Sequence, residues 1–509
     1  MDTLHDLLYG FSVALQPGNL FLVFVGCFLG TLVGVLPGIG PVGAISILLP
    51  MTFQMESAGA IIMLAGIYYG VMYGGSTTSI LVNVPGETAS VVTCLDGYRM
   101  ARQGRAGPAL GIAAFSSFFA GTIGLIGLQL IAGPLATIAL KFGPPEYFAI
   151  IVLAFTFITF LSRGSSLKAG IMALVGLILS GVGLDPITSQ QRMTFGILNL
   201  FEGIGVAPLA MGLFGVAEVF NNLETVVFKK SLAVKIKDIF PTRLDWLQAK
   251  WAIVRGTLVG FFLGILPGGG PVIATFIAYG VEKATAKNPE RFGKGAIEGV
   301  ASSESANNAA ASTSFIPLLT LGIPPNVVLA VLLGTFLIHG VLPGPLLIKE
   351  HPDVFWGLVG SMYIGNAVLL ILNLPLIPLW VQVLKIPDKI LYPLILLFCL
   401  IGAYSINNNV FDIVVMVIFG IVGYLFRKTD YEGAPLIMAF VLGPMVEVNL
   451  RRSLLISQGS FSIFFTRPIA LGALLVSLVL VIFMYRSFRK RNRSDHTIGE
   501  LEKTTNSGL

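Results

Sequence analysis

The chain has 509 residues, of which 55% are hydrophobic and only 11% are charged, with a mean hydropathy of +0.86. A water-soluble domain carries about 25% charged residues, so this composition excludes a soluble globular protein. Runs without a charged side chain, such as 109–140 and 469–485, are long enough to cross a bilayer. The short alternating segments of a β-barrel are absent. Composition therefore predicts an all-α polytopic membrane protein with about 10–14 membrane segments.

The remaining compositional features exclude several other functions. The net charge of +6 comes from loops and the C-terminal tail, so we interpret it as a signal of topology and not of nucleic-acid binding. The three cysteines show neither disulfide nor metal-site spacing. Phosphate-loop, serine-elbow and zinc-helix motifs are absent from the sequence. We therefore expect neither an enzyme nor a cofactor.

The first apolar segment is interrupted by the sequence LPGIGP at 36–41, and 230 positions later the same phrase recurs as LPGGGP at 266–271. Gly34 and Gly264 precede the two phrases in register. Proline removes a backbone donor and clashes with the preceding helical turn, whereas glycine permits positive φ. Both phrases therefore predict a broken or re-entrant helix, and the matched pair predicts two homologous halves.

Each predicted break is followed by a polar run and by a second proline. In the first half these are 73–79 and the sequence NVPG at 83–86, and in the second half they are 302–309, 312–314 and the sequence GIPP at 322–325. Polar groups at membrane depth are tolerated only inside the protein or beside an aqueous cavity. The predicted helix breaks involve Pro37, Pro41, Pro85, Pro267, Pro271 and Pro324.

Broken helices leave unpaired peptide groups that can bind ions. Free N–H groups at the start of a half-helix favour a carboxylate, and free carbonyls with side-chain oxygens favour a small hard cation. The predicted substrate-binding residues are Gly38, Gly40, Ser76, Thr77, Thr78, Gly268, Gly269, Gly270, Ser312, Thr313 and Ser314. The predicted cation-binding residues are Asn83, Asn307 and Asn308. Small residues also favour helix packing, so the prediction rests on the doubled pattern and not on any single serine or threonine.

Charge predicts the organisation of the chain. We expect an N-terminal transmembrane repeat at 1–228, a basic cytoplasmic connector at 229–255, a C-terminal transmembrane repeat at 256–485 and a basic cytoplasmic tail at 486–509. Basic residues flank the second break but not the first, which predicts that the halves are inverted. Two parallel six-helix halves are the alternative. The segment 185–203 is predicted outside, and Arg451, Arg452 and Arg467 disagree with the simplest count because they also fall outside.

The motifs closely resemble those of the large membrane subunit of the tripartite tricarboxylate transporters, the TctA family, over nearly the whole chain. The matching segments include both breaks, 83–87, 96–105, 143–148, 183–186, 292–295, 298–300, 307–309, 338–340 and 443–445. The resemblance implies a carrier of the bacterial inner membrane that works with a small four-helix membrane subunit and a periplasmic solute-binding protein. It also implies uptake of citrate-like di- or tricarboxylates with Na+ or H+ as coupling ion.

Two departures from the family pattern limit this inference. The chain has Ile323-Pro324-Pro325-Asn326 where the family usually has Ile-Pro-Gly and a small residue. It has Ser305 in the segment 304–308, where the family has Glu-Ala-Ala-Asn-Asn. Because the first departure lies at a predicted break, the substrate preference is not carried over.

Together these observations predict secondary uptake of an organic carboxylate, delivered by a binding protein and driven by a cation gradient. A passive anion or ion channel is the alternative, because it would share the broken helices but need neither a gradient nor a partner. An intramembrane enzyme would need paired aspartates or a serine–histidine couple at membrane depth, and the candidates here are single or lie near predicted helix ends.

Overall fold

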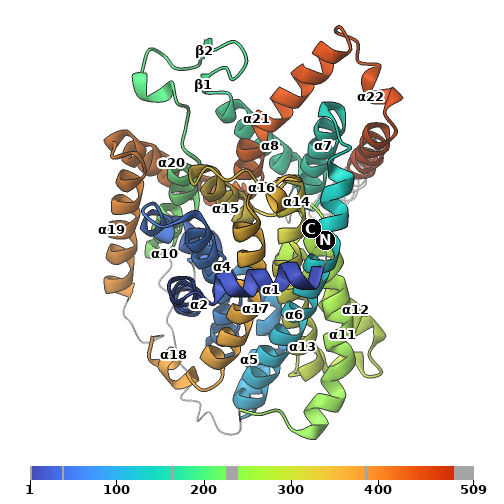
Figure 1. Cartoon of the computed structure of the whole chain (residues 1–509). Coiled ribbons are helices and arrows are strands. Elements are labelled where there is room, and N and C mark those ends of the chain that lie inside the picture. The colour runs from blue at the N-terminus through green and yellow to red at the C-terminus, as the bar shows by residue number, and fades with distance from the viewer. Residues whose placement is uncertain (1–2, 37–38, 162–164, 225–238, 384–387, 487–509) are drawn as a thin grey trace, which may run out of the picture.

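The computed structural model describes residues 3–36, 39–161, 165–224, 239–383 and 388–486, and these are almost entirely helical (Figure 1). Seven of the described helices are long and apolar enough to cross a membrane, and six shorter apolar helices accompany them. The predicted all-α polytopic fold is therefore confirmed. The sheet within these ranges is one antiparallel hairpin, β1 (Gly183–Leu184) with β2 (Gln191–Arg192).

The first half contains α1 (Thr3–Ala14), α2 (Pro17–Val35), α3 (Gly40–Leu48), η1 (Leu49–Thr52), α4 (Ser57–Val82), η2 (Thr88–Ser90), α5 (Val91–Arg102), α6 (Ala106–Ala139), α7 (Pro144–Phe160), α8 (Ser166–Ser180), η3 (Leu198–Leu200), α9 (Val206–Ala210), a π-helical turn η4 (Met211–Val216) and α10 (Ala217–Glu224).

The second half contains α11 (Arg243–Ile265), α12 (Gly270–Thr285), η5 (Pro289–Arg291), α13 (Ile297–Thr313), α14 (Phe315–Leu321), α15 (Val327–Ile338), α16 (Leu347–Glu350), α17 (Pro352–Asn373), α18 (Ile377–Val383), α19 (Asp388–Asn407), α20 (Val410–Lys428), α21 (Gly433–Ile456), α22 (Ile463–Thr466) and a last helix, Pro468–Arg486.

Both predicted helix breaks are present. α2 ends at Val35 and α3 begins at Gly40, while α11 ends at Ile265 and α12 begins at Gly270. Pro41 and Pro271 occupy the first turns of α3 and α12, where a missing N–H costs nothing. Pro267 lies within the second break, and Pro85 and Pro324 lie in the loops after α4 and α14. Pro37 and Gly38 lie outside the described residues.

A ladder of glycines packs each broken helix against a central helix of its own half. A Cβ atom at Gly26, Gly30 or Gly34 of α2 would lie 2.3–2.5 Å from the carbonyl oxygens of Met63, Ile67 and Val71 of α4. In the second half the same relation joins Gly256, Gly260 and Gly264 of α11 to Ser302, Ala306 and Ala310 of α13, at 2.4–2.6 Å. Only glycine permits such an approach of two helix backbones. The two halves therefore share a packing device as well as a break.

The central helices α4 and α13 are buried along nearly their whole length. Helices of one half pack on the centre of the other, because α6 lies along α13 and α17 lies along α4. The shorter elements show the same exchange, with α12 against η2 and α15 against α3. The halves are thus interlocked. Their inverted relation and the division at 229–255 stay predictions, and residues 229–238 of the connector lie outside the described ranges.

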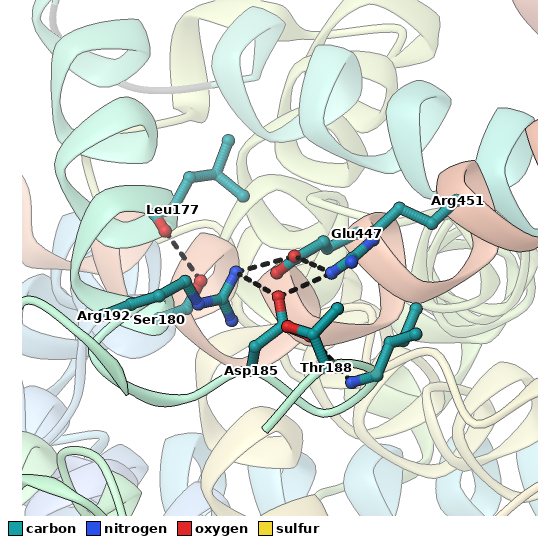
Figure 2. A network of polar contacts seen from close by, with 8 residues as sticks. Leu177, Ser180, Asp185, Thr188, Arg192, Glu447 and Arg451 are labelled. Carbon is teal, nitrogen blue, oxygen red and sulfur yellow. Dashed lines mark hydrogen bonds and ion pairs between the residues drawn. The ribbon is translucent and has the colours of Figure 1, made fainter. Parts of the chain in front are cut away.

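The β1–β2 hairpin lies at the top of the view in Figure 1, at the opposite end from α5 and its Arg99 and Arg102. Figure 2 shows how charged residues join it to α21. Arg451 contacts Asp185 at 2.6 Å and Glu447 at 3.0 Å, and Arg192 contacts Glu447 at 2.7 Å. Arg451, which disagrees with the simplest charge count, therefore has two carboxylate partners, Asp185 and Glu447.

We predict that Gly260→Ala lowers the free energy of unfolding by about 1–3 kcal/mol, because its Cβ would overlap the carbonyl of Ala306. Gly280→Ala is the matched control, since a Cβ there meets nothing within 4 Å. Thermal unfolding of the detergent-solubilised chain measures both variants. Equal melting temperatures for the two would contradict the glycine ladder.

Asp185 makes a pH-dependent prediction. Hydrogen bonds from the Thr188 backbone and from Arg451 hold the pKa of Asp185 well below its usual range. A lowered pKa stabilises the fold at pH values above the ordinary aspartate pKa of about 3.9, and the stabilisation is lost as the pH falls through the lowered pKa. Asp185→Asn should therefore melt at a lower temperature than the wild type at pH 7, and the difference should shrink below about pH 4. A difference that persists unchanged in acid would rule out this role.

Candidate functional site

A buried carboxylate on α13 forms the polar centre of the protein. The side chain of Glu304 is fully buried, and it accepts hydrogen bonds from three helices of the other half. Ser76 of α4 donates to Oε2 at 2.6 Å, Ser117 of α6 donates to the same oxygen at 3.4 Å, and Thr93 of α5 donates to Oε1. Asn308, one turn further along α13, donates to Ser117 at 2.7 Å. Hydroxyl groups thus take the place of water around a carboxylate.

A second buried carboxylate follows the first NVPG loop. Glu87 is 5% exposed, and its Oε2 caps η2 by accepting from the backbone N–H groups of Ala89 and Ser90. Its Oε1 faces α13, where Asn307 Nδ2 lies 3.4 Å away. Glu87 also lies within electrostatic range of Glu304. The two carboxylates and the Asn307–Asn308 pair therefore form one buried group, which we call the central polar cluster.

Asp96 fixes the position of α13 relative to α5. It is fully buried, and its Oδ1 accepts from the backbone N–H groups of Gly295 and Ala296, both at 2.8 Å, just before α13 begins. Tyr279 of α12 donates to Oδ2 at 2.8 Å. A carboxylate at this end also suits the helix dipole. Asp96 thereby holds the helix of Glu304 beside Thr93, which lies one turn before Asp96 on α5.

Two of the predicted substrate residues use their hydroxyls to satisfy the ends of the broken helices. Thr78 donates to the carbonyl of Val35 at 2.7 Å, immediately before the first break. Ser314 donates to the carbonyl of Gly264 at 3.1 Å, before the second. The last carbonyls of a helix lack partners within the helix, so these bonds stabilise the two interruptions in the same way.

The second proline loop of each half lies against the break of that half. A Cβ atom at Gly86 would lie 2.1 Å from the carbonyl oxygen of Gly34, and Pro325 accepts from the Gly268 N–H at 2.7 Å. Asn326 caps α15, packs against Gly270 and donates to Tyr68 of α4 at 3.4 Å. Both breaks are therefore tied to the buried centre of the protein.

The glycines at the breaks adopt the predicted conformations. Gly40, Gly268 and Gly270 have φ of +64°, +79° and +57°, which side chains with a Cβ rarely adopt. Gly269 is in the right-handed helical region, but a Cβ there would meet the carbonyl of Leu263 at 2.1 Å. The helices that follow the breaks, α3 and α12, thus begin at Gly40 and Gly270, which another residue could not replace without backbone strain.

The other predicted residues are only partly brought together. Asn307 and Asn308 belong to the central polar cluster, and Ser76 contacts it through Glu304. Thr77, Ser312 and Thr313 are buried on α4 and α13, and Thr313 donates to the Ala309 carbonyl of its own helix. Asn83 differs in position from Asn307 and Asn308, because it is exposed and ends α4 in a left-handed conformation with φ of 61°.

Sequence reasoning missed Glu87, Glu304 and Thr93 as members of the site. The available signal was the presence of a carboxylate within apolar sequence, since ionisable groups at membrane depth are functional hypotheses by default. Thr93 had no such signal, because its partner lies 211 positions away in the chain.

The model of the tripartite tricarboxylate transporter TctA family matches residues 20–438 of the chain. The chain belongs to the TctA family. This is a family of transport proteins and not of enzymes, and its members are membrane subunits of tripartite systems that include a solute-binding protein. Together with the apolar helices, membership identifies the chain as a multi-pass membrane subunit of such a transporter.

Two proteins from Agrobacterium vitis are similar in sequence to this chain. An uncharacterized 52.8 kDa protein in the TAR-I ttuC' 3' region is 52% identical over 482 residues, which cover 95% of this chain and 96% of that protein. An uncharacterized protein in the TAR-II ttuC' 3' region is 55% identical over 223 residues, covering 44% of this chain and 92% of that protein. The first match, over 482 residues, covers more of this TctA protein than the family model, which matches residues 20–438.

We predict that Asp96→Ala lowers the free energy of unfolding by about 1–3 kcal/mol, because it leaves the backbone N–H groups of Gly295 and Ala296 and the Tyr279 hydroxyl without their acceptor. Tyr279→Phe removes only one of these bonds and should cost about 0.5–1.5 kcal/mol. Melting temperatures of the purified variants measure this order. An Asp96→Ala protein as stable as Tyr279→Phe would refute the capping role.

Proposed function

We propose that this chain is the large transmembrane permease subunit of a binding-protein-dependent secondary transporter that takes up di- or tricarboxylates with a coupling cation. The observation that supports the proposal is the pair of helix breaks, each packed against the proline loop of its own half, with Glu87 of the central polar cluster directly after the first loop. Broken helices at matching positions of two halves are the arrangement in which secondary transporters hold substrate and ion.

The proposed substrate ligands are the N-terminal ends of α3 and α12. Each begins at a glycine with positive φ, and each presents N–H groups that lack intrahelical partners. Such ends bind carboxylates. Lys and Arg are absent from the segments 34–48 and 264–275 around the two breaks, so helix ends and a co-transported cation supply the positive charge. The coupling ion is Na+ or H+.

The proposed partners are a small four-helix membrane subunit and a periplasmic solute-binding protein. We place the complex in the bacterial inner membrane with the C-terminus in the cytoplasm, because the connector and the tail are basic. The hairpin β1–β2, at the end of the molecule opposite α5, then faces the periplasm (Figure 1).

Uptake by proteoliposomes tests the proposal. With its partner proteins, the chain should accumulate labelled citrate or a related carboxylate above the external concentration only when a Na+ or H+ gradient is imposed. A passive channel would merely equilibrate the label. Flux that does not depend on either gradient would therefore contradict the carrier and support the channel.

We predict that Gly268→Leu reduces uptake to the level of protein-free liposomes, because a Cβ there would lie 2.9 Å from the backbone of Ile158 and the φ of +79° would be strained. Gly280→Leu, in open space on α12, should retain uptake. Gly40→Ala is a milder variant, since it meets no neighbour within 4 Å and changes only the backbone preference of the first break. Normal uptake by both break variants would remove the site assignment.

A further inference from the structure

The central polar cluster holds two buried carboxyl groups without a basic partner among the described residues. Neither Glu87 nor Glu304 forms an ion pair among the described residues, although both are buried. Tyr68, Tyr73 and Cys94 lie near the two glutamates, and none of these side chains can carry a positive charge. A buried carboxylate is costly unless it is paired or neutralised. The cluster therefore lacks a positive charge.

One oxygen in the cluster is also without a partner. Asn307 is 1% exposed, and its Nδ2 lies beside Glu87 Oε1, but its Oδ1 has no hydrogen-bond partner among the described residues. Among the described residues, the hydrogen-bond partner of Glu87 Oε1 is this distant amide, because the backbone N–H groups of η2 bind the other oxygen. A carboxylate oxygen and an amide oxygen are thus left together, and such oxygens are the ligands of hard cations.

We propose that this pair is the binding site of the coupling cation, with Na+ bound between Glu87 Oε1 and Asn307 Oδ1 and with Glu304 supplying the second negative charge. The role of this ion in driving transport rests on the proposed function, but the ion site itself is tested without substrate. Glu304 differs from Glu87 because three hydroxyl donors already surround it. Glu304 therefore attracts the cation through its charge, whereas Glu87 and Asn307 contact the cation directly.

The position of the site connects the ion with both breaks. Glu87 directly follows Gly86, which packs against the Gly34 carbonyl beside the first break. Glu87 also lies within electrostatic range of Tyr68, whose hydroxyl accepts from Asn326, and Asn326 packs against Gly270 at the second break. An ion at Glu87 would therefore hold the two proline loops in place at the ends that we assign to the substrate.

The test measures Na+-dependent melting of the full-length purified chain, with choline chloride replacing NaCl at constant ionic strength and no carboxylate present. The wild type should be stabilised saturably by Na+, because the ion binds only the folded state. In both Glu87→Gln and Asn307→Ala the half-saturating Na+ concentration should rise at least about tenfold. Glu56→Gln is the control with the same loss of charge, because Glu56 is exposed at the other end of α4 and its side chain makes no cap.

Melting that does not respond to Na+ in the wild type would overturn the proposal, as would a Na+ response that both variants retain. Stabilisation by acid instead of by Na+, lost in Glu87→Gln, would assign the cluster to a proton and also overturn it. Because each variant is judged by its own melting with and without Na+, a general loss of stability does not mimic the effect. Failure of carboxylate uptake alone would remove the proposed function and leave the ion site standing.

Discussion

The hydrogen bonds between Glu304 and the hydroxyls of Ser76 and Thr93 are the interaction on which the structure depends. They join the central helix of the second half to α4 and α5 of the first, in a region where water is excluded. A hydrogen bond to a charged group contributes about 1.5–3 kcal/mol, and a buried carboxylate without such bonds would destabilise the fold. These hydrogen bonds therefore favour the packing of the two halves that surrounds Glu304 with hydroxyl donors.

The packing of the backbone makes this meeting of side chains possible. Glycine ladders bring α2 onto α4 and α11 onto α13, so that the two central helices are each flanked by a broken helix. Thr78 and Ser314 then satisfy the carbonyls that the interruptions expose. The breaks are consequently stable features of the fold.

The breaks could be predicted because proline and glycine act locally, through a missing donor and a permitted φ. The roles of the hydroxyls could not, because the sequence does not show which carbonyl or carboxylate a serine will meet. Ser76 and Thr78 lie two positions apart, yet one donates to Glu304 and the other to Val35. Residue type alone predicts one role for Asn83 and Asn307, whereas the structure exposes Asn83 and buries Asn307. Contacts between residues far apart in the chain, 228 positions for Ser76 and 43 for Thr78, decide these differences.

α13 shows why the site was only partly predicted. Its polar run, 302–309, predicts a functional segment, but the sequence pattern does not single out Glu304 within it. Other helices supply hydrogen-bond partners for Glu304 and Asn308. The hydroxyls of Ser302 and Ser305 and the Oδ1 of Asn307 are buried without a partner among the described residues, and Asn307 Oδ1 is the exception that lies on the side chain facing Glu87. Such an exception can be found only from coordinates.

A double-mutant cycle between Thr93→Val and Glu304→Gln tests the central contact most directly. The free energies of unfolding of the wild type, both single variants and the double variant give the coupling between the two side chains. The structure predicts a coupling energy of about 0.5–3 kcal/mol, as expected for residues in one hydrogen-bonded network. Effects that add to within about 0.5 kcal/mol would show that the two side chains do not interact, and the account of a centre shared by both halves would then be contradicted.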